Sequence, residues 1–254
     1  DAPWDGEEET PPDEDGFYPK WDGTSLFHRR GEVTPSTWAL VYQQEDIQED
    51  AVFAPPLVVG STNGMRRIGP LKPGQIGHPK QAEGYTIIGV DPATAGKAAF
   101  AVLTYNRLDG KMYVLDCINM TDPNYQKIIA QVKDLVLKYK PNEVRIEINA
   151  FQKAFELDTD FRNWMAGYGV RLDSQFTGRN KWDTNFGVAS MSTLFGTLRD
   201  GKHEDNNLLE LPSSENSEGI KALVQQLLTW KPDTNGATDC VMALWFTVIR
   251  AREL

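Results

Sequence analysis

The sequence predicts an α/β fold in which a mixed five-stranded sheet is flanked by helices. Between residues 85 and 119, three apolar runs are separated only by short turns, which is typical of an antiparallel meander. From residue 123 to residue 176, helical and strand patterns alternate, which is typical of parallel crossovers. Three further helical patterns end the chain, and the helices as a group would flank the sheet.

The meander strands are expected at residues 85–90, 98–105 and 112–119, where apolar side chains dominate. The tripeptide Leu108-Asp109-Gly110 lies between the second and third runs and marks a hairpin turn. This spacing leaves room only for short connections, so the three strands would be neighbours in one sheet.

The first turn of the meander contains Gly96 and Lys97, which at first sight indicate a phosphate-binding P-loop. Such a loop needs a glycine where Asp91 stands and a hydroxyl where Ala98 stands, so the pattern fails at both positions. The carboxylate of Asp91 would also repel a phosphate. At the mouth of a β-hairpin, this carboxylate is instead a hard oxygen ligand suited to magnesium or manganese.

The remaining elements follow from periodicity and from the residues that break it. A helix is expected from about Pro123 to Lys140, and it has five apolar side chains on one face: Ile128, Ile129, Val132, Leu135 and Val136. Strict alternation over residues 143–148 predicts the fourth strand, and residues 170–176 form the fifth. Further helices are expected at residues 150–167, 186–199, 215–230 and 238–250.

The chain is expected to divide into three segments, residues 1–36, 37–84 and 85–254. The first is rich in Asp, Glu, Pro and Gly, which favours an acidic tail that is disordered or draped. The second is expected to be a connector, with a short helix or strand near residues 37–53 and a loop-rich stretch over residues 54–84. The chain starts at Asp1 and shows no signal peptide, which favours an excised fragment.

Composition and charge exclude several classes of protein. No window approaches the ~18 apolar residues of a membrane span, so no membrane partner is expected. The isolated Cys117 and Cys240 are expected to be buried free thiols, and the three histidines are too scattered for a zinc cluster. These features favour a cytosolic protein.

The net charge of −10 is unevenly distributed along the chain. Residues 1–22 contain nine of the 36 acidic residues and one of the 26 lysines and arginines, for a net charge of −8. The remaining chain contains 27 acids and 25 bases, for a net charge of −2. Binding to nucleic acid is therefore not excluded.

Three acidic residues stand where this order of elements would bring them together. A meander followed by crossovers is the ribonuclease H-like plan, in which Asp91 and Glu147 would meet at the ends of neighbouring strands. Burial of the apolar final helix would bring Asp239 to the same edge of the sheet. Each acid also has a structural interpretation: a turn for Asp91, a salt bridge to Arg145 or a solvent-facing edge for Glu147, and a helix cap for Asp239.

Three converging carboxylates can hold two divalent cations, Mg²⁺ or Mn²⁺, roughly 4 Å apart, with both cations in contact with a scissile phosphate. The sequence therefore predicts catalytic and metal-binding roles for Asp91, Glu147 and Asp239. No histidine or serine nucleophile is needed for this chemistry, which suits a chain so poor in histidine.

Residues from Tyr85 onward resemble the nuclease domain of the large terminase subunit of tailed bacteriophages and related viruses. The segments that carry the resemblance are IIGVDPA, VRIEINAFQ, TGRNKWDTNFGVASMSTLFGTLRDGK, LPSSENSEGIKALVQQLLTW and GATDCVMALWF. Residues 37–74 also resemble the segment that joins the packaging ATPase to that nuclease. The resemblance covers roughly the last four-fifths of the chain, and the ordered set of segments is more specific than any one of them.

The resemblance implies an endonuclease that cuts concatemeric double-stranded DNA, with metal ligands at Asp91, Glu147 and Asp239. Some members have a second acid beside the last ligand, but Thr238 stands there in this sequence. Full-length members also carry a packaging ATPase, whose Walker motifs this chain lacks. The implied partners are that ATPase in cis, the portal protein and the small terminase subunit. The implied location is the host cell cytoplasm and not the mature virion, and the isolated domain is expected to be monomeric.

Basic residues near the expected metal site are candidates for DNA contact. Arg179 and Lys181 follow the fifth strand in the segment GRNKWD, and Lys97 lies in the first turn of the meander. Phosphate binding needs only a few such charges, although an ordinary solvated loop would have the same composition.

Other functions remain open from the sequence alone. The chain could be another ribonuclease H-like nuclease, such as a junction resolvase or an RNA:DNA-hybrid ribonuclease. It could also be a non-catalytic docking module of the packaging motor, in which the carboxylates are structural. A sugar-kinase-like ATP-binding fold is disfavoured, because the chain has no second glycine-rich phosphate loop.

Overall fold

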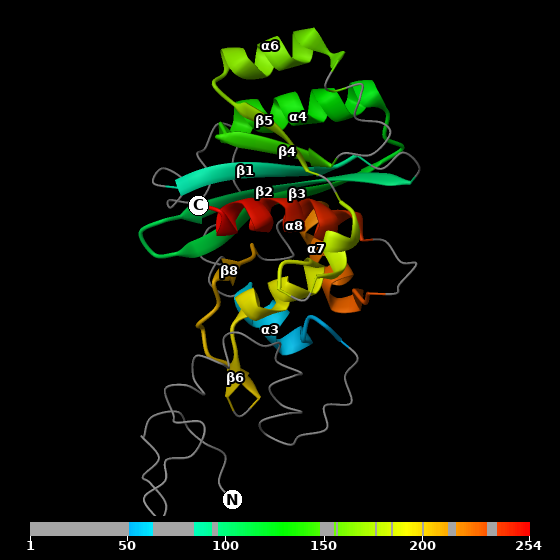
Figure 1. The fold of residues 1–254 in the computed structure, drawn as a ribbon. Helices are drawn as coiled ribbons and strands as arrows, with labels where there is room; N and C mark the ends of the chain where they lie inside the picture. The colour runs from blue at the N-terminus through cyan, green and yellow to red at the C-terminus, as the bar shows by residue number, and fades with distance from the viewer. Residues whose placement is uncertain are drawn as a thin grey trace, which may run out of the picture.

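The computed structural model describes residues 51–62, 84–92, 96–147, 155, 157–175, 177–183, 185–199, 201–212, 217–232 and 238–254. The expected acidic tail, most of the connector and the first part of the predicted 150–167 helix lie outside these residues. Figure 1 shows how the described elements are arranged along the chain.

The core of the fold is one mixed sheet with the strand order β5-β4-β1-β2-β3-β8. The antiparallel meander consists of β1 (Gly84–Asp91), β2 (Lys97–Asn106) and β3 (Lys111–Thr121). On the other side of β1, β4 (Glu143–Glu147) and β5 (Arg171–Gln175) are added in parallel. The predicted five-stranded mixed sheet is confirmed, and a short sixth strand, β8 (Leu209–Glu210), pairs in parallel with β3.

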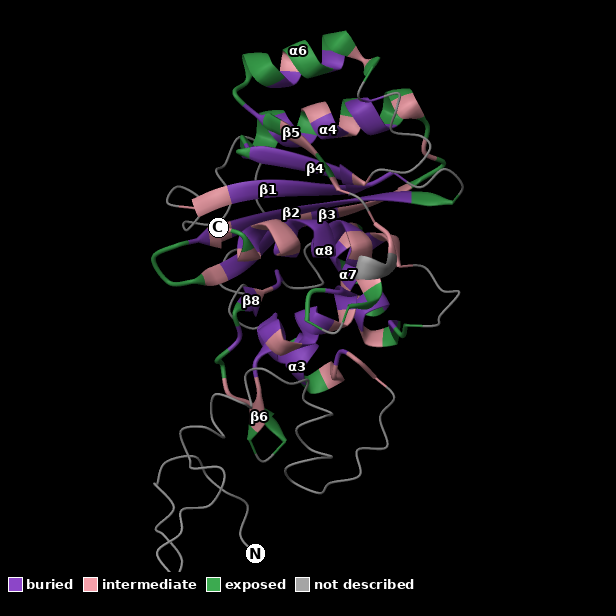
Figure 2. Cartoon of the chain, in the orientation of Figure 1, coloured by how far each residue is buried: buried purple, intermediate pink, exposed green. Residues whose placement is uncertain are grey.

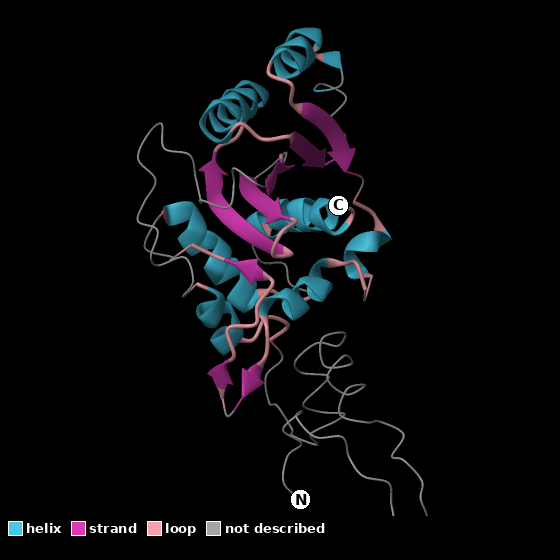
Figure 3. Ribbon diagram, turned by 90° about the vertical axis from the view of Figure 1, so that its left-hand side faces the viewer, coloured by secondary structure: helices cyan, strands magenta, loops and turns pink. Residues whose placement is uncertain are grey.

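Helices cover both faces of this sheet (Figures 1 and 3). One face carries α4 (Tyr125–Tyr139) and α6 (Thr159–Gly167), whose apolar side chains pack on β1, β2 and β4. The other face carries α7 (Glu218–Thr229) and α8 (Asp239–Arg252). Figure 2 shows that β1, β2 and β4 are mostly buried between these layers, whereas the edge strand β5 has no buried residue.

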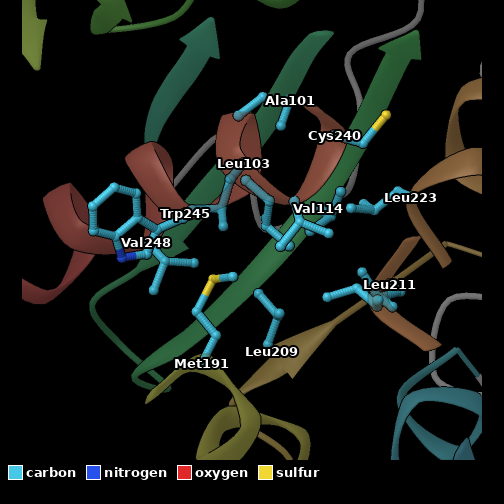
Figure 4. Packing of buried hydrophobic residues seen from close by; sticks show 14 of the residues in the cluster. Ala101, Leu103, Val114, Met191, Leu209, Leu211, Leu223, Cys240, Trp245 and Val248 are labelled. Atoms are coloured by element: carbon cyan, nitrogen blue, oxygen red, sulfur yellow. The ribbon is translucent and has the colours of Figure 1, made fainter. Parts of the chain in front are cut away.

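The helix α8 lies directly against β1 and β2, and most of its side chains are buried. Trp245 and Val248 pack into the larger hydrophobic core together with Leu103 and Val114 of the sheet (Figure 4). A Cβ atom added at Gly89 of β1 would lie 2.1 Å from the carbonyl oxygen of Ala243 in α8. The absence of a side chain at Gly89 therefore allows the close approach of helix and strand.

A buried group of ion pairs fixes the C-terminal end of α8 to the sheet. The fully buried Glu143 accepts hydrogen bonds from Tyr85 Oη, Arg145 Nε and Arg250 Nε, each at 2.9 Å. Burial alone would raise the pKa of Glu143, but these hydrogen bonds lower it below its ordinary value. Glu253, the residue after α8, also binds Arg145 at 2.9 Å.

Two sequence-based expectations about local structure were wrong. The helix predicted over residues 186–199 is a 3₁₀ helix, η5 (Val188–Phe195), followed by a hairpin of β6 (Leu198–Arg199) and β7 (Lys202–His203). Gly196, with φ of +85°, ends η5. Within the stretch expected to be loop-rich, α3 (Pro55–Ser61) forms a short helix that buries Leu57 and Val58 in the larger core.

Two simpler expectations concern the cysteines and the membrane. Cys117 and Cys240 are free and buried, as predicted. In the part of the chain that the structure describes, none of the helices has the length and apolar character needed to cross a bilayer.

Substituting Gly89→Ala should destabilise the fold by about 1–3 kcal/mol, because the new methyl group meets helix backbone that cannot turn aside. Urea denaturation measures this free energy of unfolding. Gly167→Ala is the matched control, since a Cβ atom there meets nothing within 4 Å, and it should be neutral or slightly stabilising. Equal stability of the two variants would contradict the close packing of α8 on β1.

Candidate metal centre

The ends of β1 and β4 bring Asp91 and Glu147 together. The two strands are parallel, and Val90 is in register with Ile146, so Asp91 and Glu147 are the next residues on adjacent strands. Val90 and Ile146 point into the core on the α4 side. Because side chains alternate along a strand, Asp91 and Glu147 lie on the α8 side of the sheet, where their carboxyl groups share a hydrogen bond.

Asp239 reaches the same region from the N-terminal end of α8. It is the first residue of the helix, while Thr238 takes the N-cap position without a side-chain hydrogen bond to the backbone. The structural interpretation in which Asp239 caps the helix therefore does not hold. Its carboxylate is half-buried and acts electrostatically on Asp91, so the structure places all three predicted acids in one region.

The three acids repel one another, and the effect is concentrated on Asp91. Burial raises the pKa of Asp91 to about 8, with the negative charges of Glu147 and Asp239 adding to the effect and Lys181 opposing it. Burial also raises the pKa of Asp239, and this is partly offset by its own backbone N–H and by Lys97. A site that holds carboxylates so close together without a bound cation favours protonation of one of them.

Glu147 does not form the salt bridge to Arg145 that one of its two structural interpretations offered. Arg145 forms its ion pairs with Glu143, Asp173 and Glu253. Glu147 instead accepts a short hydrogen bond from the hydroxyl of Thr177, which follows β5. Sequence reasoning missed Thr177, and the only signal for it was its place directly after the fifth strand, beside the segment GRNKWD.

The predicted basic residues are placed unequally. Lys181 lies in the 3₁₀ turn η4 (Arg179–Trp182), close enough to Asp91 to lower its pKa, and its Nζ atom lies 4.8 Å from the ring centroid of Trp182. Lys97, at the start of β2, is exposed and acts on Asp239. For Arg179 the structure describes the backbone within η4, and its side chain lies outside the described residues.

The chemistry of these groups fits a hard divalent cation. In the described residues, no three acidic, histidine or cysteine side chains are already close enough together to ligate one ion. Mg²⁺ does not need such a cage, because it is commonly held by one or two carboxylates and keeps several of its waters. The hydrogen-bonded pair of Asp91 and Glu147 supplies two carboxylates, and Asp239 lies near enough to contribute charge.

The sheet order and the placement of the acids define a ribonuclease H-like α/β fold. No protein-family model matches the sequence, and no curated protein is similar to it. The solved structures with the same fold include nuclease domains of large terminase subunits, so the resemblance seen in the sequence is confirmed for the fold.

The nuclease domain of the large terminase subunit gp2 of bacterial virus Sf6 is 9% identical, with a TM-score of 0.50. The match covers 77% of this chain and 97% of that domain. A mutant form of the same domain with manganese is 10% identical, with a TM-score of 0.51 and the same coverage. The human cytomegalovirus terminase nuclease domain, manganese-soaked and inhibitor-bound, is 13% identical over 80% of this chain and 95% of that one, with a TM-score of 0.49.

In the absence of metal, the stability of the protein should fall as the pH rises from about 4 to about 8. In this window the folded state keeps the proton on Asp91, whose pKa is about 8, while the unfolded chain has lost it. Substituting Asp91→Asn should remove a decline of at least about 1 kcal/mol, measured by urea denaturation in EDTA across this pH range. Added Mg²⁺ should stabilise the wild type at pH 8 more than the variant.

The matched control for this measurement is Asp205→Asn, which removes an exposed carboxylate in the turn after β7. It should keep the decline of the wild type. If Asp91→Asn kept the decline as well, the carboxylate of Asp91 would not be the group responsible.

Proposed function

We propose that the chain is the metal-dependent endonuclease domain of a viral DNA-packaging terminase, which cuts concatemeric double-stranded DNA by two-metal hydrolysis. The observation that carries the proposal is the convergence of Asp91, Glu147 and Asp239 at one edge of a sheet with the terminase nuclease fold. The Sf6 domain with manganese, which shares this fold, supports the choice of metal.

Asp91 and Glu147 would hold one cation between them, and Asp91 with Asp239 would hold the second. When bound at such a site, Mg²⁺ or Mn²⁺ supplies activation of water and neutralisation of the charge on a phosphate. Thr177 would orient Glu147 through their hydrogen bond. The lysine side chain of Lys181, which lies near Asp91, would attract the DNA backbone toward the carboxylates.

The wider setting is part of the same proposal. Residues 85–254 would form the nuclease domain, preceded by the connector of residues 37–84 and the acidic tail of residues 1–36. In the full-length protein a packaging ATPase would act in cis, with the portal protein and the small terminase subunit as partners. Cutting would take place in the host cell cytoplasm, by a domain that is monomeric on its own and absent from the mature virion.

The chain should nick and linearise supercoiled plasmid with Mn²⁺ or Mg²⁺ and should be inactive in EDTA. Asp91→Ala should abolish cleavage, because it removes a ligand that both cations would share. The thermal melt of the metal-free variant should stay normal or rise, since the fold no longer buries an acidic group beside two other carboxylates. Agarose gels and a thermal melt measure the two effects.

The control variant for cleavage is Asp205→Ala, which should cut like the wild type, because Asp205 is exposed and lies in the turn after β7. Full activity of Asp91→Ala would refute the metal assignment. Preferential cutting of four-way junctions or RNA:DNA hybrids over plasmid would instead place the chain with another ribonuclease H-like nuclease.

Lys181→Ala should weaken DNA binding by a similar factor for unrelated sequences, because a lysine near the carboxylates contacts phosphates rather than bases. The few candidate cations imply a shallow salt dependence, with a slope of about −2 to −4 in log K against log salt. Fluorescence anisotropy at several salt concentrations measures both. Lys202→Ala, which removes an exposed lysine in β7, should leave binding unchanged.

Sequencing of the cut ends should show no dominant site, and one dominant site would contradict phosphate-only recognition.

A further inference from the structure

A pocket of about 280 Å³ lies between the end of β5, the segment after η4 and the second half of α8. We call it the α8 pocket. Its lining residues are Gln175, Phe186, Trp245, Ile249, Arg252 and Glu253. Gln175 is in register with Glu147 on the adjacent strand, so one wall of the pocket adjoins the proposed metal centre. The volume is at the lower end of the range for small-molecule sites, which suits a ligand the size of one nucleobase.

One wall of the pocket is an aromatic ring held out to solvent. The side chain of Phe186 is 65% exposed, which is unusual for so apolar a group. Its backbone is nevertheless firmly held, because Phe186 O accepts a hydrogen bond from Trp245 Nε1 at 2.8 Å and Phe186 N donates to Asp183 Oδ1 at 2.9 Å. The exposure of the ring is therefore a fixed feature of the fold.

Another lining residue, Arg252, carries a positive charge that no acid neutralises in the described part of the chain. The guanidinium of Arg252 donates to Ser190 Oγ at 2.8 Å and to Ser190 O at 3.1 Å, both of them uncharged acceptors. The described residues include no carboxylate in an ion pair with Arg252. The nearby Glu253 is already paired with Arg145 at 2.9 Å and with Arg250 at 3.1 Å. The pocket thus keeps a cation available for an anionic ligand.

The pocket combines groups that are found in nucleotide-binding sites. They are the aromatic ring of Phe186, the cation of Arg252, the amide of Gln175 and the carboxylate of Glu253. Bases stack on aromatic rings whatever their identity, and Arg252 can attract the phosphate attached to the base. A base within a duplex cannot enter such a pocket, because its faces are covered by its neighbours. Access is therefore limited to a base that has left the stack.

We propose that the α8 pocket binds one unpaired base of a DNA strand whose backbone reaches the carboxylates, since Gln175 of the pocket is paired in register with Glu147. The proposal rests on the proposed function, since it names the form of DNA that the nuclease site takes. It implies that the preferred substrate is a single strand, or a duplex that is frayed or unpaired near the scissile bond.

The test is the binding of fluorescein-labelled oligonucleotides to the full chain in EDTA, where no cleavage can occur. The probes are a single strand, the same strand built from abasic sugars, and a fully paired duplex. Phe186→Ala should weaken binding of the single strand about tenfold and leave binding of the abasic strand unchanged. Phe186→Trp should bind the single strand as well as the wild type, because it keeps a ring for stacking.

The matched control is Tyr168→Ala, which removes another exposed aromatic ring, next to α6 on the other face of the sheet. It should leave binding of all three probes unchanged. Thermal melts of both variants should match that of the wild type, since both rings are largely exposed.

Equal binding of the single strand by Phe186→Ala and the wild type would overturn the proposal, and so would an equal loss on the abasic strand. Displacement of the single strand by free thymidine monophosphate at the same concentration as the strand would also overturn the proposal. The pocket would then be a site for free nucleotides rather than for a base within a DNA strand. Plasmid cleavage is scored separately. If the chain cuts plasmid but Phe186→Ala has no effect on binding, only the pocket proposal is refuted. If the chain does not cut plasmid but Phe186→Ala weakens binding as expected, only the nuclease assignment is refuted.

Discussion

The close packing of α8 on β1 is the constraint on which the candidate site depends. Gly89 lets the backbone of Ala243 approach the strand, and Gly89 lies two residues before Asp91 on the same side of β1. The contact that buries α8 therefore also brings its first residue, Asp239, to the end of the strand. At the opposite end of the helix, the ion pairs of Glu143 hold α8 in place along its axis. The arrangement of the acids thus follows from the packing of the whole helix.

This packing has an electrostatic cost, which is typical of sites that are built for function. Asp91 is buried near two other carboxylates, and its raised pKa measures how unfavourable that position is for a charged group. Lys181 and Lys97 come from two different connections, and each offsets part of the repulsion. Among the described residues, the fully buried carboxylate of Glu143 is by contrast paired with two arginines. The carboxylates of the site have no such pair of arginines in the described residues, and a divalent cation is a partner that suits their chemistry.

The sequence was sufficient for five of the six strands of the sheet and for the adjacency of Asp91 and Glu147, because the strand patterns are clear and the order of elements places β1 beside β4. It missed the two-residue strand β8, which is too short to show a pattern. It failed for residues 186–199, where apolar side chains point to nearly all sides of a 3₁₀ helix and leave no period that separates it from an α-helix. It also missed α3, which is one short helix in a stretch rich in turn residues. Contacts such as Thr177 with Glu147 join side chains from separate segments, so no local pattern encodes them.

Helix α8 contributes residues both to the carboxylate site and to the α8 pocket. Its first residue belongs to the carboxylate site, while Trp245, Ile249 and Arg252 line the pocket, with Gln175 and Glu147 side by side between the two. A strand with its phosphate at the carboxylates and its base in the pocket would have to be unstacked there, at a cost of a few kcal/mol for paired DNA. Relaxed, intact duplex would therefore be a poorer substrate than supercoiled plasmid or frayed DNA, unless something else opened or held it. A motor that strains the DNA, or holds it at high local concentration, would remove much of that barrier, and the timing of the cut would then lie outside this domain.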